Sequence, residues 1–138
     1  MSNFEKNLEQ ALNNAKRLTD KILIDGKLIS AQTNNKIPVL NPSTGDNIGS
    51  APQCDKNDVN IAVESAYKAF QKWKKIPARE RGKMVAAGAK RLEERKSEIE
   101  TLLSLDTGNA LRTQAIPETG ASIELTNMFA GLSGELKG

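Results

Sequence analysis

The pattern of apolar residues changes once along this chain, near Asp55, and this change limits the folds open to it. Up to Ala51, short runs of β-forming residues alternate with turn residues. From Asp55 onward, apolar residues recur every three or four positions, and no convincing strand follows. A dinucleotide-binding sheet needs parallel strands that alternate with helices. We therefore expect an α+β chain that is mostly helical and has no nucleotide-binding fold of its own.

The segment before Asp55 is predicted to hold one helix and two antiparallel strand pairs. Residues 1–20 form the expected N-terminal helix, whose apolar stripe is Phe4, Leu8, Leu12, Ala15 and Leu18. The hairpins are expected over 21–51. Asp25-Gly26 lies between Ile22–Ile24 and Lys27–Ile29, which predicts a type I′ turn with positive φ at both central residues. The second pair is 37–40 with 48–51, and Pro38 places its strand at a sheet edge.

The segment 55–135 is predicted to form about four packed helices. Asp55 and Asp58 have the spacing of a capping pair for the first, which carries Val59, Ala62, Val63, Ala66, Phe70 and Trp73 on one face. The second begins near Ala78, after Pro77, and carries Met84, Val85, Gly88, Ala89 and Leu92. Because a mid-helix glycine is unfavourable, Gly88 suggests close approach of another helix.

Capping residues also predict the bounds of the last two helices. Ser97 and Glu100 form an expected capping box for the third helix, which carries Ile99, Leu102, Leu103 and Leu105. Gly108 is placed as its left-handed C-cap. Pro117 suits the first turn of the last helix, which carries Ile123, Leu125, Met128, Phe129 and Leu132 before Gly131, Gly134 and Gly138 loosen its end.

Composition narrows the classes of function. The chain has 138 residues, a net charge of +3, no histidine and a single cysteine, Cys54. Between Lys68 and Lys96 the basic residues are interleaved with glutamates, which is typical of a solvated helix face rather than a nucleic-acid surface. One cysteine excludes an internal disulfide and suits a reducing compartment. With no signal-peptide pattern and no membrane-spanning run, we expect a cytoplasmic protein.

No residue is predicted to be catalytic, to bind a cofactor or to hold a metal. Cys54 has an adjacent carboxylate, which disfavours the thiolate, so it is interpreted as incidental. Gly131, Gly134 and Gly138 neither follow a strand nor open a helix, so they are not a phosphate loop. Two pairs of carboxylates are expected on solvated faces and therefore not in a catalytic cleft: Glu93 with Glu94, and Glu98 with Glu100. Phe70 and Trp73 are interpreted as core residues, with docking onto another domain as the alternative.

Taken in order, several residues and motifs resemble the N-terminal region of the NAD(P)-dependent aldehyde dehydrogenase superfamily, from about Lys21 to Gly138. They are Ile24-Asp25-Gly26-Lys27, Asn41-Pro42-Ser43-Thr44-Gly45-Asp46-Asn47-Ile48-Gly49, Ala62-Val63 with Ala66, Ala69-Phe70, Trp73, Arg81 shortly after Pro77, Leu92-Glu93-Glu94-Arg95, Leu105-Asp106-Thr107-Gly108-Asn109, Glu118 and Phe129-Ala130-Gly131. The turn and the Thr-Gly helix end are together the most specific of these. Asn109 departs from the lysine usual in the family.

The resemblance implies an oxidoreductase that captures an aldehyde on a cysteine, passes hydride to NAD(P)+ and releases a carboxylic acid. The family's nucleophilic cysteine, glutamate base, oxyanion asparagine and cofactor loops match no residue here. The chain is therefore expected to be a fragment, the outer part of a cofactor-binding domain over 21–138, inactive alone and without its own cofactor. Uncovered apolar faces predict either self-association, as a dimer or higher oligomer, or binding to a missing catalytic portion. The alternative is a non-catalytic helical interaction module, and a nucleic-acid-binding module is a distant third.

Overall fold

The computed structural model describes residues 2–135 and is mostly helical, as the sequence predicts. Its helices are α1 (Asn3–Leu18), α2 (Lys56–Trp73), α3 (Ala78–Glu94), α4 (Lys96–Thr107) and α5 (Ile116–Leu132), with a π-helical turn η1 (Leu111–Ala115) before the last. Its strands are β1 (Lys21–Ile24), β2 (Lys27–Ser30), β3 (Lys36–Leu40) and β4 (Asn47–Pro52). Strands and helices thus follow the order expected for an α+β chain with its strands near the start.

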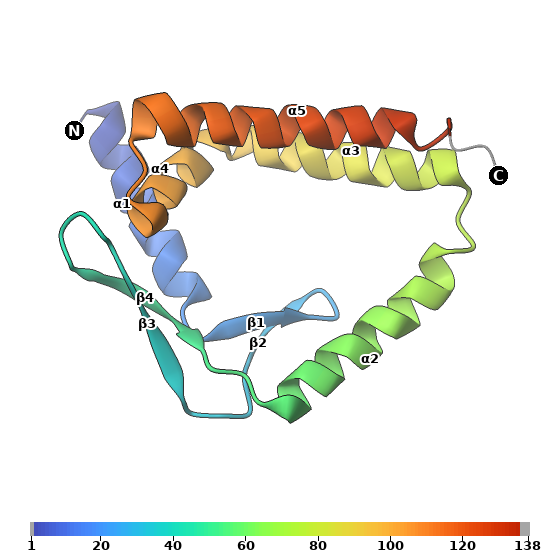
Figure 1. Ribbon diagram of the computed structural model, residues 1–138, viewed down its shortest axis with the longest axis horizontal. Coiled ribbons are helices and arrows are strands. Elements are labelled where there is room, and N and C mark those ends of the chain that lie inside the picture. The colour runs from blue at the N-terminus through green and yellow to red at the C-terminus, as the bar shows by residue number, and fades with distance from the viewer. Residues whose placement is uncertain (1, 136–138) are drawn as a thin grey trace.

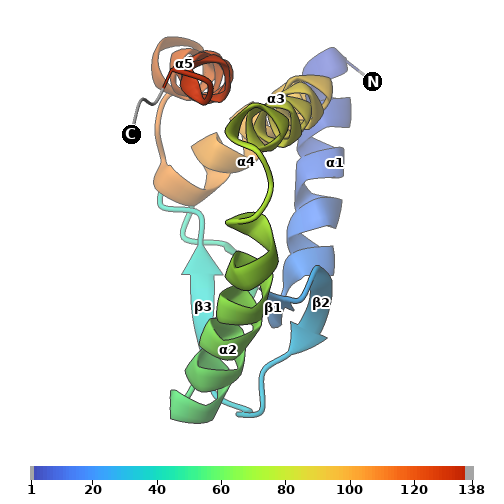
Figure 2. The ribbon, with the colours of Figure 1, turned by 90° about the vertical axis from the view of Figure 1, so that its right-hand side faces the viewer.

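The elements form an open, three-sided frame (Figure 1). Helices α3 and α5 run side by side along one side, α2 forms the second, and α1 with α4 and the strands forms the third. The β1–β2 hairpin projects from the third side toward α2. Figure 2 shows the same frame from its right-hand side, with α2 below the paired α3 and α5. Because the helices line the edges of a frame, much of each helix is left without a neighbour.

Both sheets contain two antiparallel strands, and their turns follow from local chemistry. In the β1–β2 hairpin, Asp25 has φ of 51° and Gly26 has φ of 72°, which confirms the prediction of positive φ at both positions. In the β3–β4 pair, Pro38 lies opposite Ser50, and the register shifts between Val39 and Leu40. A proline is tolerated there because each strand of a two-stranded sheet is an edge strand.

Two of the predicted helix caps are confirmed. Asp55 Oδ1 accepts hydrogen bonds from the backbone N–H groups of Asn57 and Asp58, at 2.7 Å and 3.0 Å, and Asp58 Oδ2 accepts one from the N–H of Asp55 at 3.2 Å. At the end of α4, Gly108 has φ of 74°, and its N–H donates to Ser104. The α2 start and the α4 end are therefore fixed by the residues that the sequence indicates.

The predicted capping box of Ser97 and Glu100 is wrong. Helix α4 begins at Lys96, its N-cap is Arg95, and no side chain caps that end. Arg95 also ends α3, so a single residue joins the two helices and leaves Ser97 inside the first turn. The last helix contains Pro117 in its first turn, as expected, but the π turn η1 before it has no counterpart in the prediction. Pro117 has no N–H and so cannot donate a backbone hydrogen bond, and it lies just after the junction between η1 and α5.

Close approach of two helices occurs at Gly82 and not, as predicted, at Gly88. A Cβ atom on Gly88 would have no neighbour within 4 Å, because Gly88 lies on the exposed side of α3. A Cβ atom on Gly82 would lie 2.5 Å from the carbonyl oxygen of Ala130 in α5. The prediction failed because it assumed that the bulkier stripe of α3 faces its partner. The two helices meet instead through their small residues.

The buried core consists mainly of alanine. The buried apolar residues are Ala11, Ile24, Ala89, Ala115, Ile123 and Ala130. Large apolar side chains on α1, α2, α3 and α5 remain exposed, among them Phe4, Val63, Met84 and Met128. The accessible surface is 9878 Å², whereas a compact monomer of this mass has about 7,000 Å². The fold thus leaves roughly 2,800 Å² more surface than a self-contained domain of its size.

Candidate functional site

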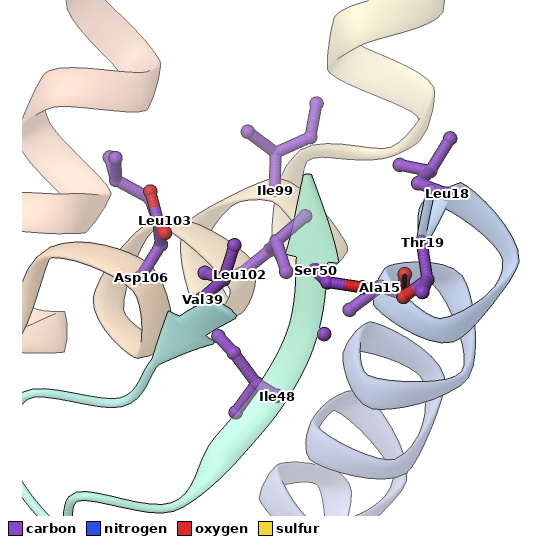
Figure 3. A pocket seen from close by; sticks show the side chains of 11 residues that line it. Ala15, Leu18, Thr19, Val39, Ile48, Ser50, Ile99, Leu102, Leu103 and Asp106 are labelled. Atoms are coloured by element: carbon purple, nitrogen blue, oxygen red, sulfur yellow. Dashed lines mark hydrogen bonds between the residues drawn. The ribbon is translucent and has the colours of Figure 1, made fainter. Parts of the chain in front are cut away.

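A cavity of about 360 Å³ lies between α1, the β3–β4 sheet and α4 (Figure 3). Eleven residues line it, most of them aliphatic: Ala15, Leu18, Thr19, Val39, Ile48, Gly49, Ser50, Ile99, Leu102, Leu103 and Asp106. Its volume is in the range of small-molecule pockets. Such a pocket becomes an active site only if a nucleophile, a base or an electrophilic group converges on it.

The polar groups around this cavity are mostly engaged in the fold. Thr19 Oγ1 donates to the carbonyl of Ala15 at 3.1 Å, and Ser50 Oγ donates to Asp20 Oδ1 at 2.6 Å. Asp106 is the only ionisable residue in the lining, and it lies at the exposed rim. The Ser50 hydroxyl does lie against a carboxylate, but Asp20 is paired with Lys36 and its pKa is lowered, so it is a weak base for activating a nucleophile. The cavity is therefore an apolar gap between three elements, without acid–base machinery.

A polar cluster around Asp20 fastens α1 to the β3–β4 sheet beside the cavity. The Asp20 carboxylate accepts hydrogen bonds from the Lys36 ammonium and the Ser50 hydroxyl, and the Asp20 N–H donates to the Ser50 carbonyl at 2.9 Å. These interactions, the Lys36 hydrogen bond first and the Ser50 hydroxyl second, hold the pKa of Asp20 below its ordinary value of 3.8. Sequence reasoning missed this cluster. Its one sequence signal is an aspartate directly before a β run. Aspartate tolerates a left-handed backbone conformation better than most residues, and Asp20 adopts one, with φ of 58°.

The carboxylate pairs that the sequence brought forward do not form an acid–base site. Glu93 and Glu94 are exposed, as predicted, and pair with nearby Lys96 and Arg91. Glu98 was predicted to be solvated, but it is buried, with 7% of its surface exposed. Glu98 can be buried because Arg95, one turn earlier, donates hydrogen bonds to both of its carboxylate oxygens, to Oε2 at 3.0 Å and also to Oε1. The Glu98 hydrogen bonds raise the pKa of Arg95, and the contact joins two residues of the same helix turn, so we assign it a structural role.

Cys54 and the late glycines lie apart from the cavity. Cys54 is exposed in the loop between β4 and α2. Gly131 lies inside α5, Gly134 follows that helix, and Gly138 is outside the described residues. Within residues 2–135, no group of three or more histidine, cysteine, aspartate or glutamate side chains is arranged to hold a metal ion. No described helix is both long and apolar enough to cross a membrane.

Phe70 and Trp73 were predicted to be core residues, and this is wrong. Both lie on α2 with 51% and 39% of their surface exposed, and Lys74 lies over the Phe70 ring at 5.5 Å. The β1–β2 hairpin lies against small side chains of α2, while Phe70 and Trp73 line an open hollow together with Ile24 of that hairpin, so neither ring is covered. The alternative that the sequence left open, a docking surface, agrees with this exposure.

The described residues do not fit NAD(P)+. Both of their sheets are antiparallel and two-stranded, and within 2–135 no glycine-rich loop joins a parallel strand to a helix. By fold and by site, the chain is a helical scaffold region of an α+β protein. Residues 28–138 match the model of the aldehyde dehydrogenase family. The chain therefore belongs to the aldehyde dehydrogenase family and corresponds to its N-terminal portion.

Individual relatives agree with this membership. The chain is 35% identical to phenylacetaldehyde dehydrogenase of Pseudomonas fluorescens over 88% of this chain and 25% of that protein. It is 32% identical to a mitochondrial benzaldehyde dehydrogenase of Antirrhinum majus over 86% of this chain and 23% of that protein. A crystal structure of betaine aldehyde dehydrogenase from Staphylococcus aureus in complex with NAD+ is 27% identical, with a TM-score of 0.84 over 93% of this chain and 26% of that one. The chain thus spans about a quarter of the length of these relatives.

Proposed function

We propose that this chain is the scaffold portion of an enzyme that oxidises an aldehyde to a carboxylic acid with NAD(P)+. The observation that carries the proposal is the family match over residues 28–138, supported by relatives named for aldehyde oxidation. In the overall reaction, aldehyde, water and NAD(P)+ give carboxylate, NAD(P)H and two protons. The described residues fit neither the cofactor nor a nucleophile, so we assign their role to support and not to chemistry.

The proposal is tested by NAD+ and NADP+ reduction with phenylacetaldehyde, benzaldehyde and betaine aldehyde. The chain alone is expected to reduce neither cofactor. A single-chain chimera, in which this chain replaces the matching quarter of the Pseudomonas fluorescens phenylacetaldehyde dehydrogenase, is expected to oxidise phenylacetaldehyde. A folded chimera without activity, assayed beside the active parent enzyme, would refute the proposal.

A second candidate function is a non-catalytic helical interaction or oligomerisation module derived from the same family. The exposed apolar faces of α2 and α5 favour it. This reading predicts self-association into a dimer or higher oligomer, measured by size-exclusion chromatography with light scattering. The mixed charges between Lys68 and Lys96 support no role for nucleic acid. We also propose a cytoplasmic location, on the basis of the single free cysteine, Cys54.

A further inference from the structure

The cavity between α1, the β3–β4 sheet and α4 (Figure 3) is walled by elements that are fastened to one another. The end of α1 is held against both strands of the sheet, through the hydrogen bonds that Asp20 accepts from Lys36 and Ser50. Thr19 also packs closely on β4, since a Cβ atom on Gly49 would lie 3.0 Å from the Thr19 hydroxyl. The walls therefore hold their places without an occupant, as in the largely pre-formed sites that bind small molecules.

A single ionisable side chain borders this cavity. Of the eleven lining residues, Leu18 and Asp106 are exposed and the other nine are partly buried, so these two mark the opening to solvent. The hydroxyl groups of Thr19 and Ser50 already donate to acceptors within the fold. The lining thus has no free side-chain donor that could replace the water around a bound anion.

One wall of the cavity lies outside the segment that the family model matches. That match covers residues 28–138, whereas Ala15, Leu18 and Thr19 belong to α1 and its C-cap. The cavity therefore depends on this chain's own N-terminal residues as well as on the matched segment. It has no part in the aldehyde oxidation proposed above, because it holds neither a nucleophile nor a base.

We propose that this cavity binds a small, neutral, apolar molecule, with the size of a benzene ring that carries a short side chain. An aliphatic cavity of roughly 150 Å³ holds benzene, so a volume of about 360 Å³ leaves room for the side chain as well. A carboxylate is rejected, because it would lose its hydration and meet the negative charge of Asp106 at the opening. An ammonium group gains little, since attraction between charges is weak at an exposed rim. The proposal does not rest on the proposed function.

Titration of the chain with 2-phenylethanol and with phenylacetate, followed by methyl NMR, tests the proposal. The two probes share one carbon skeleton and differ in charge. For 2-phenylethanol we expect a Kd of about 1 mM, with shifted methyl signals of Val39, Ile48 and Leu102 and unshifted signals of the exposed Val63 on α2. Phenylacetate is expected to bind about 10-fold more weakly or worse. Asp106→Asn should narrow this difference about 2-fold.

Filling the cavity tests where the probe binds. Ala15→Leu fills it from the α1 side and is expected to weaken 2-phenylethanol binding about 10-fold or more. Ala87→Leu is the matched control, because Ala87 is exposed on α3 and does not line the cavity, so binding should be unchanged. Far-UV circular dichroism of each free variant verifies its fold. If Ala15→Leu does not fold, Ile48→Phe fills the same cavity from β4 and carries the same expectation.

Several results would overturn the proposal. Absence of saturable binding is one, and phenylacetate binding as tight as that of 2-phenylethanol is another. Equal weakening by Ala15→Leu and Ala87→Leu, or shifts centred on Val63, would place the probe elsewhere on the exposed apolar surface. Binding that is lost in a folded single-chain chimera would show that more polypeptide fills the cavity. A chimera that binds 2-phenylethanol in the cavity but reduces neither NAD+ nor NADP+ supports this proposal and refutes the proposed function.

Discussion

Adding one methyl group at Gly82 tests how α3 and α5 pack. A Cβ atom there would lie 2.1 Å from Ser133 Oγ and 2.5 Å from the carbonyl oxygen of Ala130. The hydroxyl can rotate away, but the carbonyl belongs to the α5 backbone, so the two helices must separate. Such overpacking costs about 1–3 kcal/mol, while alanine's better helix propensity returns about 1 kcal/mol. We expect Gly82→Ala to lower the free energy of unfolding by up to about 2 kcal/mol and the Tm by up to roughly 8 °C.

Gly88→Ala is the matched control, because it makes the same change in the same helix. Gly88 is exposed, and a Cβ atom there would meet nothing within 4 Å. This variant is expected to be more stable than the wild type by up to about 1 kcal/mol. Thermal and urea unfolding, followed by far-UV circular dichroism at one fixed protein concentration, measure both. If Gly82→Ala proves as stable as Gly88→Ala, the helices do not meet through Gly82 and the packing described above is wrong.

Three further substitutions probe the joints between elements. The hydrogen bond from Lys36 lowers the pKa of Asp20. The Asp20 carboxylate therefore stabilises the fold above its unfolded pKa of about 3.8, and this effect is lost as the pH falls through the lower folded pKa. The urea midpoints of wild type and Asp20→Asn should differ at neutral pH and converge below about pH 3.8. Asp58, 3% exposed, accepts a backbone hydrogen bond from the loop before β3, so Asp58→Ala should cost about 1–3 kcal/mol and speed amide exchange at the α2 start. Gly108→Ala forces a left-handed φ and brings a Cβ atom within 2.8 Å of Pro42, so a loss of about 1–3 kcal/mol in urea unfolding is expected.

The features that the sequence predicts correctly depend on a few neighbouring residues. Asp25 and Gly26 take positive φ because a two-residue hairpin requires it. Gly108 ends α4 because a left-handed C-cap favours glycine. Asp55 caps α2 because its side chain reaches N–H groups two and three residues later. Each of these is decided within one turn of chain, where one sequence is sufficient evidence.

The features that the sequence predicts wrongly depend on which surfaces meet. Glu98 was assigned to solvent because acidic residues usually are, but Arg95 covers it. Ser97 and Glu100 have capping-box spacing, but α3 runs to Glu94, so Arg95 becomes the N-cap of α4 and Ser97 lies inside its first turn. The Asp20 cluster was not predicted at all, since its members come from three separate segments. The Arg95–Glu98 pair is a contact between residues three apart, which spacing could have shown, whereas the Asp20 cluster depends on tertiary neighbours, which residue spacing does not contain.

The exposed apolar faces of the helices show most clearly what the spacing of residues cannot predict. Helical periodicity correctly identified the apolar faces of α2 and α3, but it cannot tell what covers them. In α3, the stripe that contains Met84 and Leu92 was expected to meet another helix, yet Gly82 does so, and of the predicted stripe Ala89 is the residue that is buried. Small residues let two backbones approach closely, and the larger apolar side chains beside them are then left facing outward. A self-contained domain buries its largest apolar residues first, so an alanine core beneath exposed Phe, Trp and Met side chains indicates a region shaped to be covered by more polypeptide.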